Sequence, residues 1–296
     1  FSSRRRHTRS ASSSRGLGDV YKRQLFEIWF DGGADHPDNG APDVLPIVKK
    51  YQPNCIFYHN LQLAETRWGG SESGTVPYPC WATFPNPYSH GGDTQAERMH
   101  LLKHGDPDGK YWMPAMSDAP LRGHGGHDWF WEPDREHLIY PLDKLIDMYY
   151  QSVGHNTTLI LGVTPGPDGL MPEADVERLK EFGKEINKRF SNPIAHTSGS
   201  GNKIHLKLPG MQQVNQVVLM EDIQNGERVR EFTLEGKGAG GWKTLSTGSC
   251  IGHKFIARFE DAEVSALRLK ILNSAGEPGI RSFSVFHIED IPNNCN

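Results

Sequence analysis

The stretch TLILGVTPGPDGLMPEADVERLKEFGKEINKRF, residues 158–190, decides the fold. Residues 158–163 form a continuous apolar run, which predicts a buried strand. Residues 173–190 repeat apolar side chains at helical spacing, and Pro172 stands just before them, which predicts a helix with a defined start. A strand that leads through a loop into a helix is the unit of a parallel sheet covered by helices.

The same alternation extends upstream. Residues 25–30 (LFEIWF) and 55–59 (CIFYH) predict short strands, and residues 111–116 predict a third. Residues 42–50 and 142–153 predict the helices between them. A complete (β/α)₈ barrel takes eight strands and about 250 residues, whereas residues 25–193 hold only about four strand–helix units. We therefore predict that residues 25–193 are the C-terminal half of a TIM-type (β/α)₈ barrel and that the first half is missing.

Downstream of Asn192-Pro193 the apolar period changes to two. We interpret residues 198–201 (SGSG) as a linker and residues 200–291 as a second domain. About six strands separated by turns such as Asn225-Gly226 are typical of an antiparallel β-sandwich. The strands are predicted at residues 204–208, 216–221, 229–235, 254–259, 266–272 and 283–288.

The first 24 residues differ from the rest in charge. They carry seven Lys and Arg against one acid, for a net charge of +6, and the remaining 272 residues carry −10. The Arg/Ser-rich string resembles a translated sequencing adapter, so we expect residues 1–24 to be non-native and exclude them from the fold. A basic arm for nucleic acid is the alternative, but the acidic remainder argues against a nucleic-acid partner.

Composition excludes several other classes. No apolar run reaches 18 residues, so no membrane-spanning helix is predicted. The four cysteines lie far apart without a CxxC motif, which predicts neither a zinc cluster nor a disulfide framework. The loop at residues 164–169 contains two prolines, which remove amides that a phosphate cradle needs. We expect no metal and no cofactor.

Two carboxylates stand out by position. Asp31 ends a strand after two aromatic residues, and Glu72 lies in the Gly-rich loop RWGGSESG at residues 67–74. Two such groups on successive loops at the carboxyl ends of parallel strands, beside Trp side chains that stack on sugars, suit glycoside hydrolysis. The alternatives are a loop-capping Asp and an ordinary exposed Glu. A metal site built from His59, His124 and His127 is a competing hypothesis, but the spacing fits no compact zinc motif.

Three segments resemble the α-L-fucosidases of glycoside hydrolase family 29, and most closely the branch that prefers α-1,3/1,4-linked fucose. They are LFEIWFDGG at 25–33, RWGGSESG at 67–74 and YYQSVGHNTTLILGVTPGPDGLMPEADVERLKEFG at 149–183. The resemblance implies a retaining mechanism in which Asp31 is the nucleophile and Glu72 the general acid/base. It also implies a raised pKa of Glu72 in the free enzyme. The implied sugar contacts are Trp29, His59, Arg67, Trp68, Arg122 and Trp129.

The chain departs from the family pattern at three places. Ser71 stands where Asn usually precedes the acid/base, Met116 replaces a polar pocket residue, and a Gly/His loop follows Arg122. These changes leave the sugar and linkage open, with α-L-galactose or a decorated fucose as alternatives.

The sequence thus yields two hypotheses. The first is a fragment of an exo-α-L-fucosidase that acts on fucosylated oligosaccharides, inactive in itself and, by resemblance, from a secreted or periplasmic protein. The second is a non-catalytic carbohydrate-binding protein with a degenerate barrel, in which Trp242 and the loops around it bind glycan. Glycan binding by residues 200–296 without any hydrolysis would favour the second.

Overall fold

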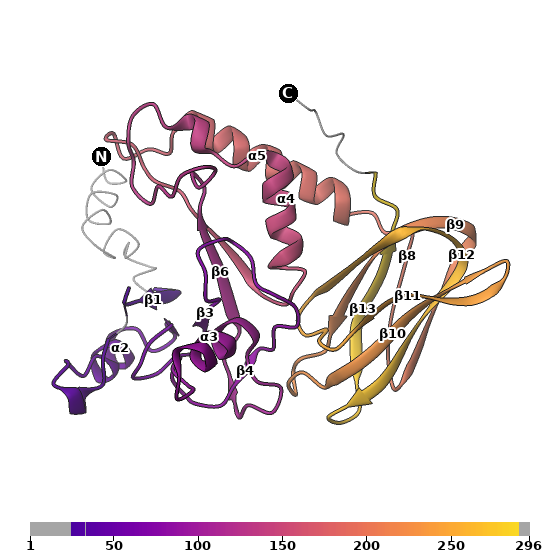
Figure 1. The fold of residues 1–296 in the computed structure, drawn as a ribbon, viewed down its shortest axis with the longest axis horizontal. Helices are drawn as coiled ribbons and strands as arrows, with labels where there is room; N and C mark the ends of the chain where they lie inside the picture. Colours follow the sequence, from indigo (N-terminus) through magenta and orange to yellow (C-terminus); the bar gives the residue numbers. More distant parts are fainter. Residues whose placement is uncertain (1–24, 33, 290–296) are drawn as a thin grey trace.

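The computed structural model describes residues 25–32 and 34–289. The adapter-like segment 1–24 lies outside the described residues. The chain forms a mixed α/β part followed by a large antiparallel sheet, which lie side by side in Figure 1.

The parallel strands of the α/β part lie next to one another in chain order. β1 pairs with β2, and β3, β6 and β7 form a second parallel sheet. A parallel bridge between Tyr58 and Thr66 joins the two sheets at the exit of β2. All residues of β6 are buried, as expected for a strand with both faces covered. The strands are β1 (Glu27–Trp29), β2 (Ile56–Tyr58), β3 (Arg67–Trp68), β6 (Ala115–Pro120) and β7 (Thr158–Gly162).

Helices and short elements connect these strands. α5 has the predicted bounds, and α4 places its apolar face against β6 and β7. The strand predicted at residues 111–116 is wrong in part, because Met113-Pro114 separates an antiparallel pair (β4 with β5) from β6. The elements are η2 (Pro37–Asn39), α2 (Leu45–Tyr51), β4 (Thr83–Phe84), α3 (Gln95–His104), β5 (Tyr111–Trp112), η3 (Glu136–Leu138), α4 (Leu142–Gln151) and α5 (Glu173–Phe190).

The second part is a six-stranded antiparallel sheet in the order β11-β10-β12-β9-β13-β8. β9 and β12 are long and carry register shifts, for example between Arg258 and Ala262. Ile204 and Leu219, from opposite ends of β9, belong to the same apolar core, so the sheet bends around one interior. Its strands are β8 (Ala195–Ser200), β9 (Lys203–Glu221), β10 (Val229–Gly238), β11 (Gly241–Gly248), β12 (Phe255–Ser274) and β13 (Gly279–Phe286).

The predicted linker at residues 198–201 is wrong. Most of it belongs to β8, which pairs with β13 along residues 195–200. Gly201, with φ at +88°, makes the turn into β9. Its Ser and Gly residues have no apolar side chains to bury, so β8 carries no hydrophobic pattern of its own. The strand therefore depends on its pairing with β13.

Polar side chains join the two parts. The Tyr78 hydroxyl donates to the Cys250 carbonyl at 2.7 Å and accepts from the amides of Ser249 and Cys250 at 2.9 Å each. The buried Glu227 carboxylate accepts from the Ala82 amide at 2.9 Å and from the Asn156 side chain. The loops of the α/β part are therefore fastened to the sheet by buried hydrogen bonds.

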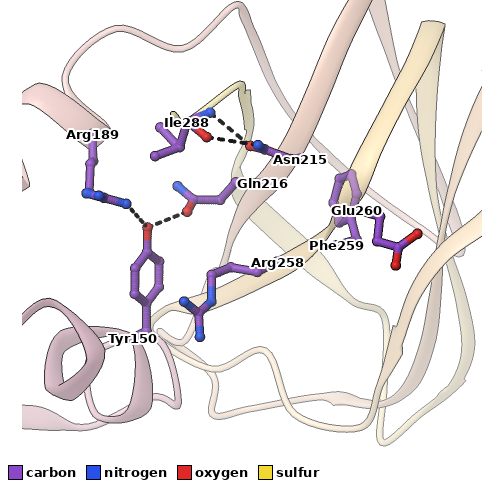
Figure 2. Close-up of a pocket in the computed structure, with 8 residues that line it drawn as sticks. All are labelled: Tyr150, Arg189, Asn215, Gln216, Arg258, Phe259, Glu260 and Ile288. Atoms are coloured by element: carbon purple, nitrogen blue, oxygen red, sulfur yellow. Dashed lines mark hydrogen bonds between the residues drawn. The ribbon is translucent and has the colours of Figure 1, made fainter. Parts of the chain in front are cut away.

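A second contact between the parts borders a cavity of about 420 Å³ that is open to solvent. Figure 2 shows Tyr150 and Arg189, from α4 and α5, facing Gln216 of the sheet. The Tyr150 hydroxyl donates to Gln216 Oε1 at 2.6 Å and accepts from Arg189 Nη1 at 3.3 Å. Arg258 lies over the Tyr150 ring, 4.3 Å from its centroid. The cavity therefore sits behind a polar contact that crosses the domain boundary.

Candidate active site

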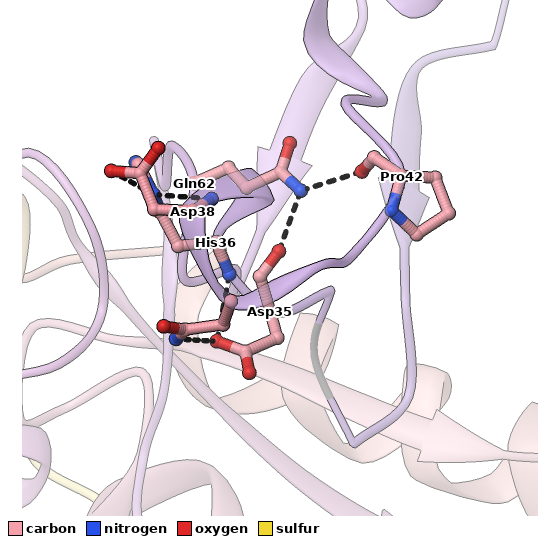
Figure 3. Close-up of polar contacts among 6 residues, drawn as sticks. Asp35, His36, Asp38, Pro42 and Gln62 are labelled. Carbon is pink, nitrogen blue, oxygen red and sulfur yellow. Dashed lines mark hydrogen bonds and ion pairs between the residues drawn. The ribbon is translucent and has the colours of Figure 1, made fainter.

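Asp31 is exposed on the loop that leaves β1. That loop is fastened to the exit of β2 by Gln62, whose Nε2 donates to the carbonyls of Asp35 at 2.7 Å and Pro42 at 2.9 Å (Figure 3). The Asp35 carboxylate in turn accepts from the His36 amide at 2.7 Å. Gln62 therefore ties the segment at residues 35–42, which follows Asp31 along the chain, to the segment that follows β2.

The Gly-rich loop that carries Glu72 is anchored to β6 at both ends. The Gly69 amide donates to the Met116 carbonyl and the Gly74 amide to the Asp118 carbonyl, both at 2.8 Å. A Cβ on Gly69 would lie 2.9 Å from the Met116 carbonyl oxygen, so only glycine permits this approach. Met116 itself is buried in β6. Residues 69–74 therefore form a short loop, the Glu72 loop, which is held against β6 at Met116 and Asp118.

Two aromatic side chains of the loop after β6 contact Glu72. Trp129 Nε1 donates to Glu72 Oε2 at 3.0 Å, and His127 Nε2 forms a short contact with the same oxygen. Trp129 is held in place by packing on Gly162, where a Cβ would lie 2.4 Å from the indole ring. Both contacts are made by residues far from Glu72 in sequence.

These contacts overturn the raised pKa that we predicted for Glu72. The hydrogen bond from His127, followed by that from Trp129, stabilises the carboxylate and lowers the pKa of Glu72. Burial, which would raise it, is the smaller effect because the side chain remains 42% exposed. The free site therefore holds an ionised Glu72 with two hydrogen-bond partners.

Polar and aromatic groups form the floor between the two carboxylates. Trp68 Nε1 donates to Asp118 Oδ1 at 2.8 Å, and Trp29 packs edge-on against Tyr58 at 4.8 Å. Burial raises the pKa of Asp118, and the charges of Glu72 and Asp31 raise it further. The charges of Asp31, after β1, and of Glu72, after β3, thus both act on Asp118 of β6.

His59 belongs to the same floor. Its Nδ1 accepts from the Trp68 amide at 3.3 Å, and its ring lies 6.0 Å from the Trp68 ring. Burial, with a contribution from His90, lowers the pKa of His59 to about 4. The imidazole is therefore neutral near pH 7, and its Nε2 is a hydrogen-bond donor.

Arg67 and Arg122 do not reach this place, contrary to our prediction that they contact the sugar. Arg67 is fully buried and donates to the carbonyls of Leu102 at 2.9 Å and Trp81 at 2.7 Å. Arg122 is 2% exposed and forms a bidentate pair with Asp175 in the first turn of α5. Both guanidinium groups serve the packing of the α/β part.

The structure brings together Asp31, Glu72, Trp29, His59, Trp68 and Trp129 among the predicted residues. Sequence reasoning missed two members of the site, Asp118 and His127. Asp118 could have been found from its position on a buried strand, since a charged side chain is rarely buried without a role. The sequence suggests His127 only as a metal ligand, together with His59 and His124.

The histidines do not assemble a metal site in the described part of the chain, where no group of three His, Cys, Asp or Glu residues could hold an ion. His124 instead packs against the Tyr140 ring.

Among the described residues, the helices are too short or too polar to span a membrane. In the sheet, the Arg268 guanidinium covers the Trp242 ring at 4.1 Å, which leaves less of that ring for a glycan.

Comparison with known proteins gives a consistent result. The α-L-fucosidase family model matches residues 15–189. Alpha-L-fucosidase 1 of Arabidopsis thaliana is 26% identical over 307 residues, which cover 89% of this chain and 58% of the plant protein. The chain thus spans little more than half the length of this curated relative.

Solved structures agree with the sequence matches. A protein of Bacteroides thetaiotaomicron VPI-5482, provisionally named an α-L-fucosidase, superposes with a TM-score of 0.87 at 51% identity, over 96% of this chain and 66% of its own. A glycoside hydrolase 29 family member from an unknown rumen bacterium gives 0.79 at 27% identity, over 93% and 52%. Both parts of the chain are therefore found together in other proteins.

Proposed function

The chain belongs to the α-L-fucosidase family, and on that premise we propose that its α/β part carries the catalytic residues of a retaining exo-α-L-fucosidase. In this proposal residues 25–193 form the C-terminal half of a (β/α)₈ barrel and the β-sandwich packs beside it. Asp31 attacks the anomeric carbon of a terminal L-fucose. Glu72 protonates the departing oxygen and then activates the water that releases the sugar. Substrates are oligosaccharides with terminal α-1,3/1,4-linked fucose.

One observation carries the proposal. Asp31 follows β1 and Glu72 follows β3, with β2 between these two strands, and the charges of both carboxylates raise the pKa of the same buried carboxyl, Asp118. Retaining glycosidases use two carboxyl groups about 5–5.5 Å apart, one on each side of the glycosidic bond. Trp29 and Trp129 supply aromatic faces near these carboxylates, of the kind that pack against the apolar face of a sugar.

The test measures release of L-fucose from p-nitrophenyl α-L-fucoside and from α-1,2-, α-1,3-, α-1,4- and α-1,6-fucosylated oligosaccharides. It is run on the chain and on any longer gene product that contains it. Asp31→Asn should abolish turnover while the circular dichroism spectrum stays unchanged, and Asp38→Asn in the same loop should leave turnover intact. Proton NMR should show α-L-fucose as the first product. Full activity in folded Asp31→Asn, or release of β-L-fucose, would refute the mechanism.

Linkage is decided by the same substrates. A preference for the α-1,3/1,4-linked oligosaccharides would support the assigned branch, and faster cleavage of α-1,2 or α-1,6 linkages would refute it. p-Nitrophenyl α-L-galactoside serves as the competing sugar, because Met116 stands where the family has a polar residue.

A further inference from the structure

The loop between β6 and η3 places an imidazole directly on the candidate acid/base. His127 Nε2 and Trp129 Nε1 both contact Oε2 of Glu72, and the two nitrogen atoms lie 3.1 Å apart. The rings of His127 and Trp129 meet edge-on at 5.9 Å. Two side chains of this loop therefore converge on one oxygen atom of Glu72.

This contact has a defined backbone frame. The loop closes through a bridge between Arg122 and Asp128, with the Asp128 amide donating to the Arg122 carbonyl at 3.2 Å. Arg122 is in turn fixed by its buried pair with Asp175. His127 thus stands next to a residue whose backbone is tied to the sheet, although its own side chain is 55% exposed.

We propose that Glu72 and His127 act as a pair that shares one proton, and that this pair, rather than Glu72 alone, protonates the departing glycosidic oxygen. The proposal rests on the proposed function. His127 acts through Glu72 and is a positioning residue in this scheme. Trp129 donates a hydrogen bond to Glu72 Oε2 and so holds the carboxylate in the orientation in which His127 contacts the same Oε2 atom.

The chemical need for such a partner follows from the contacts of Glu72. A general acid must carry its proton at the working pH, and a carboxyl whose ionised form accepts two hydrogen bonds gives up that proton early. An imidazole ordinarily keeps its proton to about pH 6.5, roughly two units above a Glu carboxyl. His127 Nε2, in contact with Glu72 Oε2, thus supplies a second group that can carry the proton.

Two other carboxyl groups belong to this site, because the charges of Glu72 and Asp31 both raise the pKa of Asp118. Behind the loop, Asp128 faces Arg135 at 3.4 Å, so these two charges largely cancel.

The reaction balances as follows. The shared proton moves to the glycosidic oxygen as its bond to the anomeric carbon breaks, and an Asp31 oxygen bonds to that carbon. Water then attacks the same carbon, the bond to Asp31 breaks, and one proton of the water returns to the Glu72–His127 pair. The two halves leave the pair with the single proton that it held at the start.

The first experiment needs no substrate. In the chain labelled with ¹³C at Glu Cδ, the Glu72 carboxyl resonance is assigned from its absence in Glu72→Gln and titrated by NMR. His127→Gln should raise the pKa of Glu72, and His124→Gln in the same loop should leave it unchanged. An unchanged Glu72 titration in His127→Gln would overturn the pair whether or not the chain hydrolyses fucosides.

The second experiment uses the catalytically active form established by the fucoside assay. In His127→Gln the alkaline limb of the pH profile of kcat/KM should shift to lower pH by one to two units. This shift lowers kcat/KM at pH 7.5 by about 10-fold to about 100-fold. His124→Gln should keep the wild-type profile. A uniform loss at every pH would indicate a purely structural role and would overturn the proposal. Absence of turnover in the wild-type protein would instead refute the proposed function, while the NMR result would still decide the pair.

Discussion

The buried pair of Arg122 and Asp175 allows a quantitative test of how the α/β part is held together. The Arg122 Nε and Nη2 atoms donate to Asp175 Oδ1 and Oδ2 at 3.1 and 2.6 Å, and both side chains are at most 2% exposed. The pair fixes the exit of β6 to the first turn of α5, where the helix dipole also favours an anion. Removing one partner leaves a buried charge, which costs about 3–5 kcal/mol.

The assay is urea unfolding followed by far-UV circular dichroism for Arg122→Met, Asp175→Leu and the double variant. Each single variant should lose about 3–5 kcal/mol of unfolding free energy, and the double variant should lose clearly less than the sum, because no buried charge remains. Lys188→Met is the control: Lys188 is 71% exposed and its ammonium lies 3.9 Å from Glu185, so its loss should cost about 1 kcal/mol or less.

Two results would refute this reasoning. One is a loss below about 1 kcal/mol in Arg122→Met, and the other is strict additivity in the double variant. If Arg122→Met were as stable as wild type but bound fucosides more weakly, the sugar contact predicted from the sequence would be correct after all.

Three further predictions concern other parts of the molecule. Tyr78→Phe leaves buried groups of Cys250 unpaired and should cost about 1–3 kcal/mol in urea unfolding; no loss would show that the domain contact does not depend on this hydroxyl. Gly69→Ala pushes a Cβ against the Met116 carbonyl, so it should lower kcat/KM and change the melting temperature little. An unchanged kcat/KM would contradict the anchoring of this loop to β6. Burial raises the pKa of Glu221 to about 7, so the folded state holds a proton that the unfolded state releases near pH 4.5. Stability should therefore fall as the pH rises from 5 to 7, and Glu221→Gln should flatten that slope in urea titrations; an unchanged slope would assign the effect elsewhere.

The sequence predicted the elements whose pattern is local. α5 and β7 carry their own apolar periodicity, and their predicted bounds agree closely with the observed ones. β3 spans only two residues and exists because β6 lies beside it, so no local pattern marks it. α3 buries only Leu102 and has almost no apolar face, although the capping box of Thr94 and Glu97 at its start was a readable signal.

The site divides in the same way. Asp31 and Glu72 follow strands in recognisable motifs, and in the structure the charges of both act on the same residue, Asp118. An arginine in such a motif can point toward the ligand or away from it, and the sequence could not show that Arg67 binds backbone carbonyls inside the protein. The sign of the Glu72 pKa shift depends on His127, which is 55 residues away and reaches Glu72 only through tertiary structure.

The Glu72 loop continues directly into the segment that Tyr78 joins to the antiparallel sheet by hydrogen bonds. From Gly74 the chain reaches Tyr78 within four residues, so the antiparallel sheet supports the loop that carries Glu72. Exchanging this sheet for an unrelated module would remove that support from Glu72. The two parts should therefore be inherited, and engineered, as a single unit.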